Sequence, residues 1–194
     1  LAQWVGALLN AVFLKVRLRA EDEPLKLRLH ERFFGRYGLF FLVAIGQALI
    51  VSLGDLFYVQ IQCLYPWHFV LAAAVTGLCF SLINYALVFA LDNIGMALSV
   101  IVMVMQVAGS GGTYPVEVLP DIFQKLYDYM PFKYSMNAMR ETIAGMYGSN
   151  YTHDIVVLLC IALGSIIFGL ALYYPCLGLN RLIESSKRKS EIMQ

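Results

Sequence analysis

Few residues of this 194-residue chain have the types and spacing that catalysis or metal binding requires. His30 and Glu31 do not form the zinc-binding pattern HExxH, because position 34 is Phe34. The chain has only three histidines, far apart, and its four cysteines have no CxxC spacing. Packing as small apolar side chains is therefore the favoured role of the cysteines. We predict no catalytic residue, no metal site and no cofactor.

The glycine-rich run at 109–113 does not have the pattern of a phosphate-binding loop. That loop is GxxxxGK[ST] after a strand, and no lysine follows the glycines here. The dinucleotide-binding pattern GxGxxG is absent as well. The chain itself is therefore not expected to bind ATP.

Polar side chains interrupt the apolar runs of the chain at Gln47, Asp55, Asn84 and Gln106. Such residues most often form hydrogen bonds with neighbouring helices, and we favour that role. The alternative is that Gln47, Asn84 and Gln106 line a transport path. Asp55 lies near the end of its run, where interfacial exposure is expected rather than a buried functional acid.

The composition indicates which class of protein must position these residues. Hydrophobic residues make up 60% of the chain, charged residues only 14%, and the mean hydropathy is +0.69. A soluble domain is about half apolar and a quarter charged, and disorder needs low hydrophobicity with high charge. The net charge of +1 gives no indication of nucleic-acid binding. The composition therefore predicts an integral membrane protein.

The apolar runs predict an all-α membrane domain rather than a barrel. Their residues are nearly continuously apolar, whereas barrel strands alternate. Four runs have the length of a spanning helix, and a fifth, at the start of the chain, is short and begins without Met. We interpret the fifth as the end of a span, so the chain is expected to be a C-terminal fragment. The five predicted spans are 1–14, 39–58, 69–91, 94–113 and 155–177.

A row of small residues, Ala44, Ala48 and Ser52, lies on one face of the second span. Small residues at a spacing of four allow two membrane helices to approach closely. We therefore predict a helix contact there.

The distribution of Lys and Arg predicts the orientation in the membrane. Seven lie in 15–36, four in the tail at 181–194 and three in 111–154, whereas the connection at 59–68 has none. Five spans place 15–36 and the tail on the same side of the membrane. We therefore expect the N-terminus of the fragment outside and its C-terminus in the cytoplasm.

The segment 15–38 is predicted to be a cytoplasmic segment that contains a helix. Pro24 after three acidic residues suits a helix start. The composition favours a helix in the headgroup layer with Arg28 and Arg32 near anionic lipid. The alternative is a docking surface for a cytoplasmic partner, formed by Arg28, Leu29, Arg32 and Phe33. One apolar face of this helix is formed by residues four apart: Leu25, Leu29, Phe33 and Tyr37.

The segment 111–154 is predicted to hold two short amphipathic helices outside the membrane. The first lies at 121–130 and the second at 132–143, and both are too short to cross a core of about 30 Å. Interfacial aromatic side chains are expected here. They are Tyr114, Tyr127, Tyr129, Tyr134, Tyr147 and Tyr151.

Within this segment, 111–145 reads GGTYPVEVLPDIFQKLYDYMPFKYSMNAMRETIAG. It resembles the signature of ABC transporter type-2 membrane domains. More closely, the chain is similar to the C-terminal region of the YhgE/Pip family, the phage infection proteins. Two further stretches share this similarity: LAQWVGALL at the start of the chain and GRYG at residues 35–38. The motif positions are Gly111, Gly112, Pro115, Pro120, Pro131, Arg140 and Glu141.

The resemblance implies a six-helix half-transporter, of which this chain, residues 1–194, holds five helices. It implies that a first span and a large extracellular region precede the fragment. The segment 15–38 would hold the coupling helix that meets a separate ATPase, and 111–154 the short extracellular helices. The domain would pair with a second copy or another membrane domain in the bacterial cytoplasmic membrane.

Two functions follow from the resemblance. The first is export across the membrane, powered by the separate ATPase. The second is a phage receptor or envelope scaffold, for which these helices are only the anchor in the bilayer. A membrane enzyme has no supporting set of residues.

Overall fold

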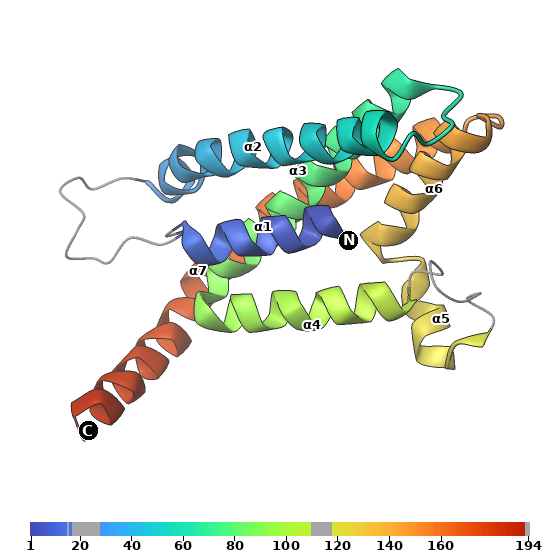
Figure 1. Cartoon of the computed structure of the whole chain (residues 1–194). Coiled ribbons are helices and arrows are strands. Elements are labelled where there is room, and N and C mark those ends of the chain that lie inside the picture. Colours follow the sequence, from blue (N-terminus) through green and yellow to red (C-terminus); the bar gives the residue numbers. More distant parts are fainter. Residues whose placement is uncertain (15, 17–27, 110–117, 193–194) are drawn as a thin grey trace.

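The structure is a computed structural model that describes residues 1–14, 16, 28–109 and 118–192. No strand occurs in these ranges, which confirms the all-α class. Figure 1 shows long helices packed side by side, with the two short helices α5 and α6 at one end. The elements are α1 (Ala2–Phe13), α2 (Leu29–Leu53), the π-helical turn η2 (Gly54–Tyr58), α3 (Pro66–Leu91), α4 (Asn93–Gly109), α5 (Asp121–Tyr127), α6 (Pro131–Ala144) and α7 (Asn150–Ile192).

Helix α3 is the centre of the bundle. It contacts α1, α2, α4, α6 and α7. The three long helices differ in how much of their most apolar stretch is buried. The buried share is 72% for α3, 22% for α2 with η2, and 17% for α7. A helix that is apolar all round is expected to be buried on all sides, whereas α2 and α7 expose apolar faces that suit lipid or another membrane helix.

Three helices of the described residues are long and apolar enough to cross a membrane: Leu29–Tyr58, Pro66–Leu91 and Asn150–Cys176. They correspond to three of the predicted spans. The apolar helices Ala2–Phe13 and Asn93–Val107 are shorter. The three long spans are therefore confirmed as membrane-length helices, and crossing by α1 and α4 stays a prediction.

The predicted small-residue contact joins α2 to α3. Ala44, Ala48 and Ser52 are all buried. A Cβ placed on Gly77 of α3 would lie 3.0 Å from the Ala48 Cβ and 3.3 Å from the Ala44 carbonyl oxygen. The two backbones therefore approach closely where the small residues meet, as the row predicted.

The turn between α3 and α4 is closer still. Asp92, the one residue between the two helices, has a positive φ of 52°, and the chain changes direction there. A Cβ on Gly95 would lie 2.2 Å from the carbonyl oxygen of Leu87. Only glycine leaves room for this approach, so Gly95 fixes α4 against the end of α3.

The structure differs from the predicted interfacial helix at 15–38. Residues 15 and 17–27, which include Leu25, lie outside the described residues, but from Leu29 onward the chain is one helix with the following span. The Glu31 carboxylate accepts a hydrogen bond of 2.7 Å from the Arg28 backbone N–H, which caps this helix. Phe33 is buried, and Leu29 and Tyr37 pack against the same core. A spacing of four cannot distinguish a face on lipid from a face on a neighbouring helix, and here the neighbour is α3.

Two aromatic clusters hold the bundle together. At one end, the Phe33 ring of α2 packs edge-on against two rings of α3, with its centroid 4.9 Å from that of Tyr85 and 5.1 Å from that of Phe89. The Phe89 ring in turn stacks on Tyr173 of α7. The Tyr85 hydroxyl donates a 2.8 Å hydrogen bond to the Phe33 carbonyl oxygen. In the other cluster, Trp4 of α1 contacts Phe80 and Phe132. Together the clusters link α3 to α1, α2, α6 and α7.

Candidate functional site

The motif-bearing region forms one end of the bundle, where α6 contacts α3 and α7, and α5 contacts α4 (Figure 1). Pro120 directly precedes α5, and Pro131 is the first residue of α6. Proline at a helix start has a fixed φ that suits the helix, and its missing N–H is not needed there. The two prolines therefore set where these short helices begin, and both predicted short helices are confirmed as helices.

The corner between α5 and α6 is tied by Lys133. Its ammonium group forms an ion pair with Asp128 and lies 4.5 Å from the ring centroid of Tyr127. The Tyr134 hydroxyl donates a 2.6 Å hydrogen bond to the Asp128 carbonyl oxygen. Burial alone would lower the pKa of Lys133, but the Asp128 carboxylate outweighs burial and raises it. Lys133 stays charged at physiological pH, so the corner keeps its ion pair.

Helix α6 also holds the connection between α2 and α3. The Thr142 carbonyl oxygen accepts hydrogen bonds from the Tyr65 N–H at 3.1 Å and from the Cys63 thiol at 3.2 Å. The Tyr151 hydroxyl, at the start of α7, donates to the His68 carbonyl oxygen at 2.9 Å. This end of the bundle is therefore one connected unit of four chain segments.

The family-motif positions divide into three groups. Gly111, Gly112 and Pro115 lie outside the described residues. Pro120 and Pro131 start helices, as above. Arg140 is exposed, and the Glu141 carboxylate accepts a 3.4 Å hydrogen bond from the Tyr147 N–H. The positions that the structure describes shape the end of the bundle, and they do not converge on a pocket.

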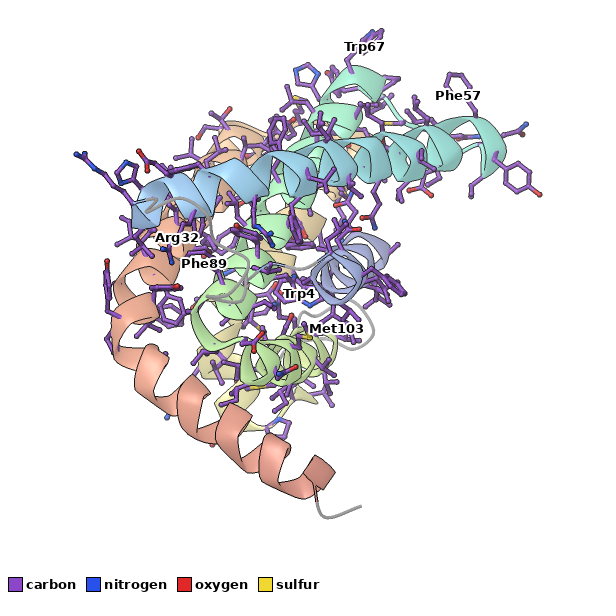
Figure 2. The ribbon with its side chains drawn as sticks, turned by 90° about the vertical axis from the view of Figure 1, so that its left-hand side faces the viewer. Trp4, Arg32, Phe57, Trp67, Phe89 and Met103 are labelled. Carbon is purple, nitrogen blue, oxygen red and sulfur yellow. The ribbon has the colours of Figure 1, made fainter. Side chains whose placement is uncertain are left out.

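The predicted docking residues lie at the opposite end of α2. Figure 2 shows Arg32 at one end of that helix, while Phe57 and Trp67 lie at the other. Arg28 is exposed, and Leu29 and Arg32 are half-buried. Phe33 is fully buried in the core, so this chain leaves it no surface with which to meet a partner. The docking hypothesis therefore depends on Arg28 and Arg32, and the half-buried Leu29 could contribute only part of its side chain.

The polar residues inside the spans have two different roles. Gln47 Nε2 donates to the Ala2 carbonyl oxygen at 3.0 Å, joining α2 to α1. Asn84 Nδ2 donates to the Phe80 carbonyl oxygen at 2.8 Å, and its Oδ1 accepts from the Ser99 hydroxyl of α4. Both therefore bond to helix partners, as favoured from the sequence. Gln106 is buried, and neither polar atom of its side chain has a hydrogen-bond partner among the described residues.

Further buried polar residues were not singled out from the sequence, and Gln3 and Thr76 are examples. Both have side-chain polar atoms without a hydrogen-bond partner in the described part of the chain. Threonine is common in membrane helices and Gln3 lies in a short apolar helix, so neither stands out by type. The signal that identifies them is their burial in the bundle, which depends on how the helices pair.

Comparison with known proteins agrees with this helical architecture. Residues 26–172 match the family model described as ABC-2 family transporter protein. The chain belongs to the ABC-2 transporter family. It is also 34% identical over 114 residues to the uncharacterized protein YhgE of Bacillus subtilis (strain 168), a stretch that covers 59% of this chain and 15% of YhgE. No solved structure gives a significant match.

These matches confirm the resemblance to YhgE-like ABC-2 membrane domains. The ABC-2 chain is a multi-pass bacterial membrane protein with a transporter-like function. Its family is a transporter component rather than a classical enzyme. The chain corresponds to a small part of YhgE, so the activity and partners of a whole protein are matters for proposal.

Proposed function

We propose that this chain forms membrane-spanning helices of an exporter in the bacterial cytoplasmic membrane, powered by a separate cytoplasmic ATPase. The observation that carries the proposal is the family match over residues 26–172, on a bundle built around a buried, uncharged central helix. ABC-2 membrane domains usually pair with such an ATPase and work as dimers. The exposed apolar faces of α2 and α7 suit pairing with a second membrane domain.

The proposed topology has five crossings, with α1 and α4 included. Helix α4 has 17 residues, or about 26 Å at 1.5 Å per residue, which is slightly short of a core of about 30 Å. The bilayer accommodates a short helix by local thinning. The uncharged connection at 59–65 then lies outside with α5 and α6, and the basic residues before α2 lie in the cytoplasm.

Reporter domains inserted into the full-length protein test this topology. Alkaline phosphatase, which needs disulfides, should be active after Gln62 and after Gly148, whereas a fluorescent protein should be bright after Asp92. These connections lie on alternate sides only if α3 and α4 both cross. Cytoplasmic signals at both Asp92 and Gly148 would mean that α4 does not cross, and would contradict the five-span proposal.

The proposed ATPase contact is the basic start of α2. Arg28 directly precedes the helix, and the helix continues from there through the bundle to Tyr58. The buried Phe33 and its hydrogen-bonded partner Tyr85 fix this start against α3. Movement of the docked segment would therefore be transmitted to α3 through packed rings rather than through a flexible hinge.

In-cell photocrosslinking tests this docking. With benzoylphenylalanine at Arg28 of the full-length protein, we expect a crosslink to a protein with a P-loop ATPase domain. The matched control is Lys125, an exposed basic residue of α5 near the other end, where we expect no such crosslink. Crosslinks from Arg28 only to lipid or envelope proteins would favour the anchor role of a receptor or scaffold instead.

A further inference from the structure

Four large aromatic side chains are exposed at the end of the bundle that lies farthest from the start of α2. We refer to them as the aromatic collar: Phe57 and Tyr58 of η2, Trp67 of α3, and Tyr147 between α6 and α7. Their exposed fractions are 76%, 91%, 84% and 82%. Figure 2 shows Phe57 and Trp67 directed away from the helices, far from Arg32. The described part of the chain therefore leaves most of each ring available to a partner.

Contacts between two connections place the collar at one end of the bundle. The Tyr65 N–H donates a 3.1 Å hydrogen bond to the Thr142 carbonyl oxygen. A Cβ on Gly145 would lie 3.7 Å from the Leu64 side chain. The connection before α3, into which η2 leads directly, therefore lies beside the connection between α6 and α7, which carries Tyr147.

The backbone at this corner excludes a position in the hydrocarbon core. The chain is not helical from Val59 to Tyr65. Non-helical backbone does not face lipid at that depth, because its N–H and C=O groups would have no hydrogen-bond partners. Asp55, two residues before Phe57, is partly exposed, and a carboxylate in hydrocarbon is costly. Both features require water close to this corner.

The side chains of the same corner disfavour bulk water. No Asp, Glu, Lys or Arg occurs in 56–91, and Val59 and Leu64 are 61% and 64% exposed beside the rings. Exposed apolar surface of this kind marks an interaction site. Trp and Tyr gather at the headgroup level of a bilayer, where the ring contacts apolar groups and its polar edge reaches water. The headgroup layer therefore suits both the backbone and the rings.

The length of α2 supports this depth. Leu29–Tyr58 has 30 residues, or about 45 Å at 1.5 Å per residue. A bilayer with its headgroup regions is about 40–45 Å thick. If Arg28, directly before α2, lies in the headgroup layer of one leaflet, then Tyr58 reaches the headgroup layer of the other leaflet and does not project far beyond it.

We propose that the aromatic collar binds the headgroup layer of the outer leaflet and thereby fixes the depth of α2 and α3 in the bilayer. The partner is phospholipid rather than protein, with the rings at the boundary between the polar heads and the acyl chains. The connection at 59–65 then lies along the membrane surface instead of projecting into water. Only the choice of leaflet rests on the proposed topology, and the collar does not depend on transport.

Depth-dependent fluorescence quenching of the full-length protein tests the collar. The protein, with its native cysteines replaced by alanine, is placed in vesicles of phosphatidylethanolamine and phosphatidylglycerol, and Trp67→Cys carries a bimane label. A nitroxide is attached to the lipid either at the headgroup or at the end of an acyl chain. We expect the headgroup nitroxide to quench the label at least about twofold more than the chain-end nitroxide.

The matched control is Leu42→Cys with the same label, because Leu42 is 67% exposed and lies near the middle of Leu29–Tyr58. Here the chain-end nitroxide should quench more strongly than the headgroup nitroxide. Phe57→Cys serves as the second collar variant if Trp67→Cys does not accumulate in the membrane.

Three results at Trp67→Cys would overturn the collar. Quenching by iodide in the water, with neither nitroxide effective, would mean that this corner projects into water. Quenching by none of the three would mean that protein covers the rings, and stronger quenching from the chain end would place the corner in the core. Because the vesicles contain no ATPase, failure of the collar and failure of the exporter proposal are separate results.

Discussion

Replacing Gly95 by alanine is expected to lower the free energy of unfolding by about 3 kcal/mol, at the upper end of the usual cost of overpacking. The added Cβ would lie 2.2 Å from the Leu87 carbonyl oxygen and 2.9 Å from the Val88 Cα. Both are backbone atoms, so no side chain can rotate away to relieve the clash. The whole of α4 must shift from the end of α3 instead.

Gly46→Ala is the matched control, because a Cβ on this glycine of α2 meets nothing within 4 Å. Alanine favours a helix over glycine by about 1 kcal/mol, so this variant should be as stable as the parent or more stable. Unfolding of the purified full-length protein in mixed micelles measures both. Equal stability of the Gly95→Ala protein and its parent would show that the α3–α4 turn is not as tight as described.

Replacing Trp4 by alanine should cost about 3 kcal/mol, the lower part of the range for removing a buried aromatic side chain. The Trp4 ring is fully buried, with centroids 5.0 Å from Phe80 and 5.7 Å from Phe132. Its loss would leave a cavity where α1, α3 and α6 meet. In a membrane this cost comes from lost packing, since lipid is as apolar as the core.

Trp67→Ala gives the comparison for Trp4, because the Trp67 side chain is 84% exposed at the start of α3. Figure 2 shows it pointing away from the bundle. The same micelle unfolding should find a change below about 0.5 kcal/mol, as for a surface substitution. If the two tryptophan variants lose similar stability, the packing of α1 on α3 is not what holds the bundle together.

The sequence predicted the features that depend on one helix at a time. Apolar runs gave the helical class and the three long spans, and the spacing of Ala44, Ala48 and Ser52 gave the α2–α3 contact. The positions of Pro120 and Pro131 indicated where the short helices α5 and α6 begin. Each of these is a local property of composition or period, which a single sequence records.

Features that depend on which helix lies opposite were not predictable in the same way. The row of Leu29, Phe33 and Tyr37 suits a lipid surface as well as it suits α3. The position of α4 against the end of α3 depends on the tight turn at Asp92 and Gly95. Nothing in the sequence spacing of Gln3, Thr76 and Gln106 indicates that all three are buried.

The most direct measurement for an ATPase-driven exporter is purification of the tagged full-length protein in mild detergent, with mass spectrometry of its partners and an ATP hydrolysis assay. We expect a stoichiometric P-loop ATPase, hydrolysis of ATP, and an association reduced at least about tenfold by Arg28→Glu with Arg32→Glu, since reversed charge at a docking surface repels its partner. Lys125→Glu, on α5, should change neither. Recovery of the protein alone or with envelope proteins, without ATP hydrolysis, would contradict the proposed function.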